Sequence, residues 1–285
     1  MNFFYTSIGI SKQAFHQQLG RTACHRECRE SLLPIIHQLR NDHPTMSSRA
    51  MYYKLMPEGI GRDAFEAYCS CENLSVKRVK NWRRTTDSSG VTRFENLANN
   101  LCLSNIDQLW QSDITYFELN GRFYYLTFII DAFSRRILGH HTSGRLLTDQ
   151  TTLPALRMAL KERKRENLEG LIFHSDGGGQ YYDKEFLKLT RQHKILNSMC
   201  EFAWENGKAE RINGVIKNNY LKHRRIRNLN ELIKEVDRSV KLYNFDKPHI
   251  GLQRLTPIKF ERQLKETSMQ KSKIRNIGKS MQIVN

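Results

Sequence analysis

Three acidic residues stand at positions where a carboxylate could do chemistry. Asp113 interrupts the apolar, β-branched run WQSDITYFEL, Asp176 ends the short apolar run LIFHSD, and Glu210 lies in NGKAERINGVIK. A carboxylate in an apolar run is costly to bury alone and is normally paired or bound to a cation. If these three side chains converge, they form an oxygen-ligand site for a hard divalent cation.

A helix that begins near Asn206 would carry Glu210. Asparagine is a good N-cap residue because its side-chain oxygen accepts hydrogen bonds from the first free N–H groups. On a helix of 3.6 residues per turn, Glu210, Asn213 and Lys217 share one polar face. The adjoining apolar stripe consists of Ile212, Val215, Ile216 and Tyr220. Such a helix packs inward while it directs a carboxylate and an ammonium toward one cleft.

The other two acids belong to a strand-rich region. The runs WQSDITYFEL, RFYYLTFIIDAF and RRILGHHTS read as strands, and Asn120-Gly121 between the first two predicts an antiparallel hairpin. A helix follows, with its basic residues Lys161, Arg163, Lys164 and Arg165 on the polar side. The strand LIFHSD, the helix DKEFLKLTRQH and the strand ILNSMC come next. This order predicts an α/β fold with a mixed sheet and flanking helices.

The charge balance indicates a nucleic-acid partner. Among 285 residues, 46 lysines and arginines face 29 acids, which gives a formal charge of +17. No run is long enough to span a membrane, and the N-terminus has no secretory pattern, so we expect an intracellular protein without membrane contact. Six cysteines are expected to be reduced thiols; a zinc site from Cys24, His25, Cys28 and His37 is the weaker alternative.

The N-terminal region predicts helices and DNA contact. Two or three short helices are expected in the first forty residues, separated at Gly20 and ended by Pro44. A helix-turn-helix rhythm follows from Ser47. We expect a helical DNA-binding region at 1–88, a linker at 89–104, a catalytic domain at 105–262 and a basic, mobile tail at 263–285.

Motifs along nearly the whole chain resemble a known family. The strings are YYKLMPEGIGRDAFE, VKRVKNWRRTT, WQSDITYF, YYLTFIIDAFSRRILG, HSDGGGQY, ENGKAERINGVIKNNYL and YNFDKPHIGLQRLTP. In this order and spacing they resemble the OrfB-type transposases of bacterial insertion sequences, the IS-three family, within the DDE group that includes retroviral integrases. Gly177 and Asn219 depart from the family pattern, whereas the acidic triad is intact.

The resemblance implies a ribonuclease-H-like catalytic domain in which Asp113, Asp176 and Glu210 are both catalytic residues and metal ligands. Two Mg²⁺ ions, for which Mn²⁺ is a plausible substitute, would lie about 4 Å apart in an in-line phosphoryl displacement. Asp113 would bridge the ions, Asp176 would bind one and Glu210 the other. Water would attack in strand cleavage, and a DNA 3′-hydroxyl in strand transfer. The expected DNA-binding residues are Lys217, Asn213, Lys77, Arg78, Lys80, Arg83, Arg84, Arg224 and Arg225.

Several acids and histidines admit a structural interpretation instead. Asp131 also interrupts an apolar strand, but Ser134 and Arg135 offer it structural partners. Glu205 precedes the Glu210 helix, where an acid commonly serves the helix dipole. The histidines His140, His141, His174 and His193 are expected to be structural or surface residues, and His174 retains a possible DNA contact.

The resemblance also implies partners and a location. These are terminal inverted repeats and target DNA, a homo-oligomer on DNA, a fusion or association with an upstream-frame product, and the bacterial cytoplasm near the nucleoid. The alternative to an active transposase is a catalytically silent DNA-binding regulator or relic of such an element. An enzyme that hydrolyses RNA in hybrids is disfavoured by the helix-turn-helix region.

Overall fold

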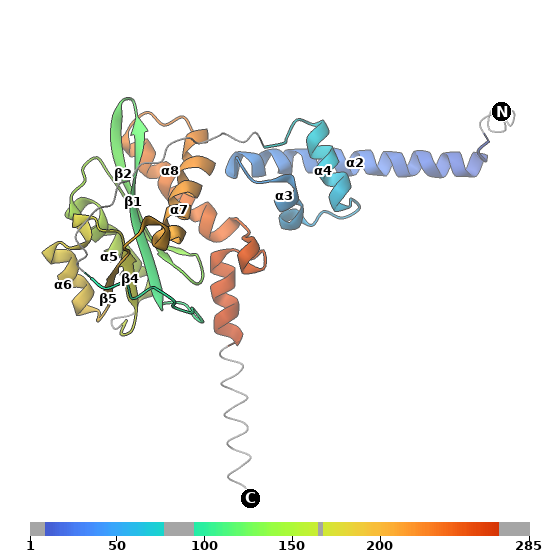
Figure 1. Cartoon of the computed structure of the whole chain (residues 1–285). Coiled ribbons are helices and arrows are strands. Elements are labelled where there is room, and N and C mark those ends of the chain that lie inside the picture. The colour runs from blue at the N-terminus through green and yellow to red at the C-terminus, as the bar shows by residue number, and fades with distance from the viewer. Residues whose placement is uncertain (1–8, 77–93, 165–167, 268–285) are drawn as a thin grey trace, which may run out of the picture. The chain divides into compact units, whose positions relative to one another are not determined.

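A computed structural model describes residues 9–76, 94–164 and 168–267. The chain divides into two compact units, Met1–Lys80 and Asn81–Asn285 (Figure 1). The basic segment at residues 77–84 and most of the expected tail at 263–285 lie outside the described residues, while 263–267 are helical. Within the described ranges, no helix has both the length and the apolar character that a bilayer crossing needs.

The N-terminal unit contains helices α2 (Lys12–Asp42), α3 (Ser48–Leu55) and α4 (Arg62–Cys71). The hydroxyls of Ser11 and Ser47 accept hydrogen bonds from the first turns of α2 and α3, as N-caps do. Ile36, Met51 and Phe65 are fully buried in a small core between the helices. The order of α3, a turn and α4 agrees with the predicted helix-turn-helix.

The predicted break at Gly20 was wrong, because α2 is a single helix of 31 residues that passes through Gly20 and Pro34. A glycine costs a helix only about 1 kcal/mol relative to alanine, so it does not end a helix by itself. The C-terminal part of α2 is also held by the core through Leu32, Ile36 and Leu39.

The second unit is built on a five-stranded mixed sheet with strand order β3-β2-β1-β4-β5. Strands β1 (Leu109–Leu119), β2 (Arg122–Asp131) and β3 (Ile137–Ser143) form an antiparallel meander. Strands β4 (Ile172–Ser175) and β5 (Leu196–Met199) extend the sheet in parallel with β1. Asn120 and Gly121 both have positive φ, 52° and 75°, as a type I′ hairpin turn requires. The predicted hairpin and sheet are confirmed.

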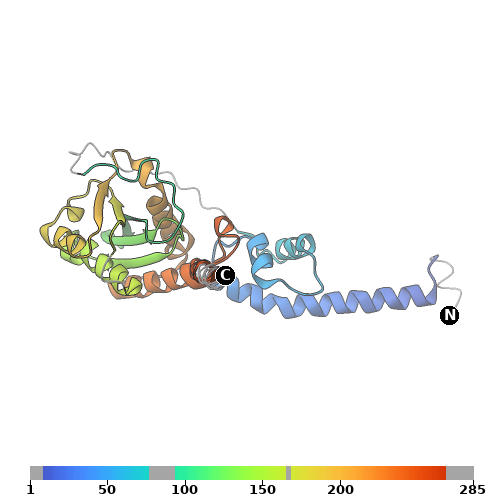
Figure 2. The same cartoon turned by 90° about the horizontal axis from the view of Figure 1, so that it is seen from below.

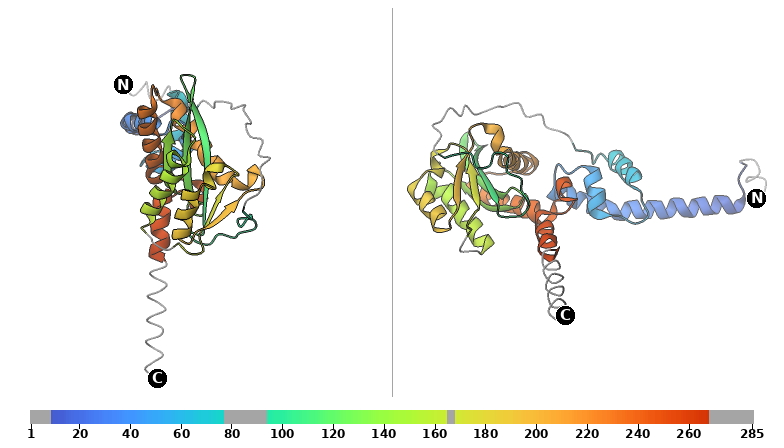
Figure 3. Two further views of the ribbon diagram at one scale, coloured as in Figure 1. Left: turned by 90° about the vertical axis from the view of Figure 1, so that its left-hand side faces the viewer. Right: turned by 60° about the horizontal axis from the view of Figure 1, so that its bottom comes forward.

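Helices cover both faces of this sheet (Figures 1 and 2). Helices α5 (Thr152–Arg163) and α6 (Lys184–Gln192) pack on one face with Trp110 and Ile129. Helices α7 (Gly207–Asn219) and α8 (Leu229–Lys241) pack on the other with Leu126 and Phe128. Figure 3 shows these layers from two further directions. Successive strand residues point to opposite faces, so each strand supplies both cores.

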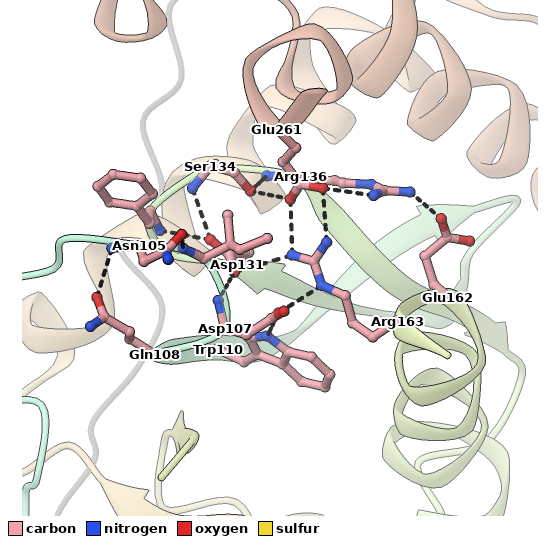
Figure 4. A network of polar contacts seen from close by, with 12 residues as sticks. Asn105, Asp107, Gln108, Trp110, Asp131, Ser134, Arg136, Glu162, Arg163 and Glu261 are labelled. Carbon is pink, nitrogen blue, oxygen red and sulfur yellow. Dashed lines mark hydrogen bonds and ion pairs between the residues drawn. The ribbon is translucent and has the colours of Figure 1, made fainter. Parts of the chain in front are cut away.

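A buried ionic network closes the fold around Arg163 (Figure 4). Its guanidinium, 5% exposed, pairs with Asp107 (2.6 Å), Asp131 (3.2 Å) and Glu261 (2.8 Å). Glu261 lies in the helix at 257–267 and also binds Arg136 at 2.8 Å. We expected the Arg163 side chain on the polar side of α5. It is instead buried, where three carboxylates pair with it.

The described part of the expected linker also contacts the sheet and helices of the second unit. The ring of Phe94 stacks on Tyr182 at 5.5 Å between centroids, and the N–H of Leu97 donates to Ser198 Oγ at 2.9 Å. The linker therefore packs on the second unit at Phe94 and Leu97.

Candidate active site

Two neighbouring parallel strands place Asp113 and Asp176 near each other. Asp113 is in the middle of the central strand β1, on the face that α7 covers, and Asp176 directly follows β4. Gln111 of β1 pairs with His174 of β4, so the same register continued by two residues brings Asp113 level with Asp176. Adjacent strands are about 4.8 Å apart, which brings the two carboxyl groups together.

The charges of these carboxyl groups are poorly compensated. Burial, then the charge of Asp176 and lastly that of Glu210 raise the pKa of Asp113 to about 7. Burial also raises the pKa of Asp176, although the Gly178 N–H opposes this by donating to Asp176 Oδ1 at 3.2 Å. Desolvation and like-charge repulsion both favour the protonated forms, and a bound cation would oppose both effects.

Side-chain hydrogen bonds align α7 with β1. They run from Asn206 Nδ2 to Ser112 O (2.8 Å), from Asn213 Nδ2 to Asp113 Oδ2 (2.7 Å) and from Lys217 Nζ to Thr115 Oγ1 (2.6 Å). The apolar stripe of α7 is packed in the core, with Ile212 and Ile216 buried. The predicted division of this helix into a polar face and an apolar stripe is therefore found.

Asn206 is the N-cap residue of α7, as predicted, but its side chain does not cap the helix. The side-chain oxygen accepts no hydrogen bond from α7, and the side-chain amide donates to the Ser112 carbonyl. The carboxylate of Glu205 accepts hydrogen bonds from the N–H groups of Glu201 (2.7 Å) and Phe202 (3.1 Å). Glu205 thus stabilises the turn before α7, which agrees with its structural interpretation.

Glu210 lies in the first turn of α7 with an exposed side chain. In residues 9–76, 94–164 and 168–267, no three acidic, histidine or cysteine side chains stand close enough to hold one metal ion. The donor types nevertheless fit a hard divalent cation, since Asp113 and Asp176 are two poorly compensated carboxylates.

Much of the sequence of the second unit matches a known family. Residues 105–203 match the family described as "Integrase core domain", and residues 193–257 match a second family of the same description. Together the two matches span residues 105–257, more than half of the 285-residue chain. The chain belongs to the integrase core superfamily. It is a DDE-type polynucleotidyl transferase, an insertion-sequence transposase with the predicted ribonuclease-H-like fold.

Relatives cover both parts of the chain. The chain is 26% identical to the "Insertion element IS600 uncharacterized 31 kDa protein" of Shigella sonnei, over 89% of this chain and 95% of that protein. It is 33% identical to "Transposase InsF for insertion sequence IS3fB" of Escherichia coli (strain K12), over 45% and 44%. The HTLV-2 integrase catalytic core domain, solved in complex with magnesium, covers 54% of this chain and 96% of its own, at 21% identity and a TM-score of 0.43.

Asp131 does not join the carboxylates of the integrase core. Its Oδ1 accepts hydrogen bonds from the N–H groups of Phe133 (3.0 Å) and Ser134 (2.8 Å), and its Oδ2 pairs with Arg163 (Figure 4). The partner that we expected in Ser134 is found. Arg135 uses its backbone N–H to bind the Asp131 carbonyl at 2.8 Å. Asp131 is therefore a structural residue.

His174 is fully buried beside the site, and its Nδ1 lies 2.9 Å from Ser198 Oγ. Burial lowers the pKa of its imidazole, which favours the neutral ring. His140 pairs with Asp237 at 2.8 Å between Nε2 and Oδ1. Both contacts agree with the structural interpretation of these histidines.

An exposed aromatic pair near the site was missed in the sequence. The rings of Phe202 and Trp204 stack with 4.4 Å between centroids and 3° between planes. Trp204 is 73% exposed and Phe202 49% exposed. The available signal was the spacing of two aromatics just before the Glu210 helix, in EFAWEN.

The expected DNA-binding residues fall into three groups. Lys77, Arg78, Lys80, Arg83 and Arg84 lie outside the described residues. Arg225 is exposed beyond α7, whereas Arg224 is partly buried, 3.7 Å from Glu235. Lys217 and Asn213 lie beside the carboxylates, but Asn213 is only 4% exposed and binds Asp113. Asn213 thus positions a carboxylate in this structure.

Proposed function

We propose that this chain cleaves the ends of an insertion sequence and joins them to target DNA, using Asp113, Asp176 and Glu210. The observation that carries the proposal is the pair of neighbouring carboxylates on β1 and just after β4, with α7 hydrogen-bonded to one of them. In the first step, water attacks a terminal phosphodiester, and the bond to the 3′-oxygen breaks to leave a 3′-hydroxyl. In the second, this hydroxyl attacks a target phosphodiester and displaces a target 3′-oxygen.

Mg²⁺ is the proposed cofactor, with Mn²⁺ as a substitute. The raised pKa values of Asp113 and Asp176 support a cation between them. When bound, two such ions stabilise negative charge on the attacking and leaving oxygens. Asp113 would contact both ions, Asp176 one and Glu210 the other. Glu210 would join the set from the first turn of α7, where its charge already acts on Asp113.

The residues around the carboxylates have positioning roles in this proposal. Asn213 holds Asp113 Oδ2 in place through its amide. Lys217 lies beside Thr115 and over the ring of Tyr116, 5.4 Å from its centroid, and is suited to a phosphate of the terminal nucleotide. The exposed pair of Phe202 and Trp204 offers a stacking surface for an unpaired terminal base.

The proposed partners are terminal inverted repeats and target DNA, bound by a homo-oligomer, with an upstream-frame product as a further associate. The net charge of +17 and the helix-turn-helix unit support binding to DNA. The cytoplasm, near the nucleoid, is the proposed location.

The test is Mg²⁺-dependent joining of a labelled duplex that carries the terminal repeat flanking the coding sequence. Wild-type protein should join it to a plasmid, and Asp176→Asn should lose joining while it still binds the duplex. Asp149→Asn, which changes an exposed aspartate of η1 (Thr148–Gln150), is the matched control and should retain joining. Joining by Asp176→Asn at the wild-type rate contradicts the proposal. Binding without joining by the wild type identifies a silent DNA-binding protein instead.

A further inference from the structure

Four cations gather on the flank of α7 that faces away from the carboxylates. They are Arg135 in the turn after β2, Lys208 and Arg211 in the first turns of α7, and Lys247 after the π-helix η5 (Leu242–Asp246). Lys208 and Arg211 are three residues apart and share a helix face, whereas Lys208 and Glu210 are two apart and do not. Across the described ranges, no carboxylate forms an ion pair with any of the four.

A cavity of about 320 Å³ opens at this cluster. Leu101, Leu103 and Phe133 supply its apolar wall, and Arg135, Lys208 and Gly251 line it as well. We call it the cationic cavity. Leu101 is 40% exposed, so the apolar wall reaches solvent. Cations beside apolar carbon suit a ligand with a charged group and a less polar body, such as a nucleotide of a DNA strand.

Two features of the backbone, at Arg135 itself and at Gly251, determine where the Arg135 side chain lies in the cationic cavity. Arg135 has a φ of 60°, in the left-handed region that non-glycine residues seldom adopt. A Cβ at position 251 would overlap its guanidinium, at 2.8 Å from Nη1 and closer still to Nη2. Gly251 therefore lets the Arg135 guanidinium lie directly against the backbone. A strained residue held in place by its surroundings is typical of a functional position.

The cations repel one another without a compensating acid. Burial, and then the charge of Arg211, lower the pKa of Lys247 to about 8. Asp131 lies near enough to Lys208 for their charges to interact, but its carboxylate is already bound to Arg163. An anion in the cationic cavity would relieve this repulsion.

Structural contacts are found for two of the four, Lys208 and Lys247, and the Lys247 ammonium lies over the ring of Tyr243, 5.9 Å from its centroid. The Lys208 ammonium donates to the Ala132 carbonyl at 2.9 Å and so helps attach α7 to the end of β2. Arg211 is exposed, and its charge lowers the pKa of its neighbours Lys247 and His249. A role in attaching α7 to the sheet therefore leaves the gathering of the other cations unexplained.

We propose that the cationic cavity binds a phosphodiester of the DNA strand, with Arg135 and Lys208 at the phosphate and the apolar wall against the sugar. This inference rests on the proposed function only for the identity of the ligand. It places a DNA contact on the opposite flank of α7 from Glu210, so that a bound strand crosses this helix.

The test measures DNA affinity as a function of salt for the full chain carrying Asp176→Asn, so that cleavage does not interfere. Adding Arg135→Gln or Lys208→Gln should each reduce the slope of log K against log salt by about 0.9, the contribution of one phosphate contact. Lys188→Gln and Arg191→Gln, exposed cations of α6 on the other face of the sheet, should leave the slope unchanged. Equal slopes for all four variants overturn the proposal.

A second measurement identifies the ligand and does not depend on a variant folding. Lysines are reductively methylated with ¹³C, and the titration of the Lys247 signal is followed by NMR. A duplex should raise the pKa of Lys247, and the position of the Lys188 signal should not change. A rise with inorganic phosphate but not with duplex assigns the cavity to a free anion and contradicts the proposal, as does no rise with either. Because joining is not measured, failure of the proposed catalysis remains a separate result.

Discussion

The amide of Asn213 donates a 2.7 Å hydrogen bond to Asp113 Oδ2, across 100 positions of the sequence. Asp113 is thereby held on the face of the sheet where it meets Asp176, and α7 is fixed to the strand that carries it. The hydrogen bond also favours the charged carboxylate, since it lowers a pKa that burial and Asp176 raise. One contact thus links the placement of a helix with the protonation of a carboxylate.

Asn213→Ala should move the pH dependence of joining to higher pH. Loss of the donated hydrogen bond raises the pKa of Asp113 further above about 7, so a larger share of the carboxyl stays protonated at neutral pH. Joining rates measured from pH 6 to pH 9 test this. Asn219→Ala on the same helix is the control and should keep the wild-type profile. A uniform loss of rate with an unmoved profile would indicate a purely structural role.

Asp113→Asn should stabilise the metal-free protein at pH 8 but not at pH 5. The folded-state pKa of about 7 lies above the ordinary 3.8, so the native protein binds this proton more tightly than the unfolded chain does. The stabilisation that comes from the protonated Asp113 carboxyl is therefore fully present below pH 3.8 and is lost as pH rises through 7. Thermal unfolding in chelator measures the effect, with Asp149→Asn as the control. In millimolar Mg²⁺ the wild type should regain stability at pH 8, and the variant should not.

Glu261→Gln should cost about 3–5 kcal/mol of unfolding free energy, because it leaves Arg163 buried with less opposing charge. Burial alone would raise the pKa of Glu261, but its hydrogen bond and charge interaction with Arg163 lower it below 4.5. The stabilisation by Glu261 is therefore present above pH 4.5 and lost as pH falls through the folded-state pKa. Urea unfolding at pH 7 and pH 3 tests both points.

The control for Glu261 is Glu266→Gln, in the same helix but exposed, which should change stability by less than about 0.5 kcal/mol. Equal effects of the two substitutions would show that the network around Arg163 adds little to stability.

Trp204→Ala should weaken binding of a duplex with an unpaired terminal nucleotide by about 1–3 kcal/mol, the usual value of one base–aromatic stack. Binding to a closed hairpin of the same sequence should change little, because no end base is free. Phe245→Ala, which removes another exposed aromatic, is the control. Equal losses for both DNA forms would argue against stacking on an end base.

The sheet could be predicted from the sequence, because short stretches of sequence determine its strands and its hairpin turn. Asn120-Gly121 permits the positive φ values of the hairpin turn, and the apolar stripe of α7 follows the helical period. The long helix α2 was not predicted, because Gly20 was expected to end a helix there, whereas the helix continues and its C-terminal part packs in the core around Ile36. The buried position of Arg163 was also missed, since its partners Asp107, Asp131 and Glu261 are 32 to 98 residues away.

The candidate site was predicted in its residue types but not in its contacts. Helical spacing placed Asn213 and Lys217 on one face, yet it gave no indication that Asn213 would bind Asp113. The cluster of Arg135, Lys208, Arg211 and Lys247 was not predicted, because it comes from three segments that only the folded chain brings together.

The ionic contacts of Arg163 bear on where the catalytic fold can be trimmed. The matched integrase core ends at residue 257, four positions before Glu261, while Asp107 lies at the opposite edge of the same region. A fragment cut at residue 257 would therefore lose Glu261, and with it the ionic contact through which Arg163 connects the start of the domain to its end. Recombinant pieces meant to work alone should retain the helix at 257–267 in full.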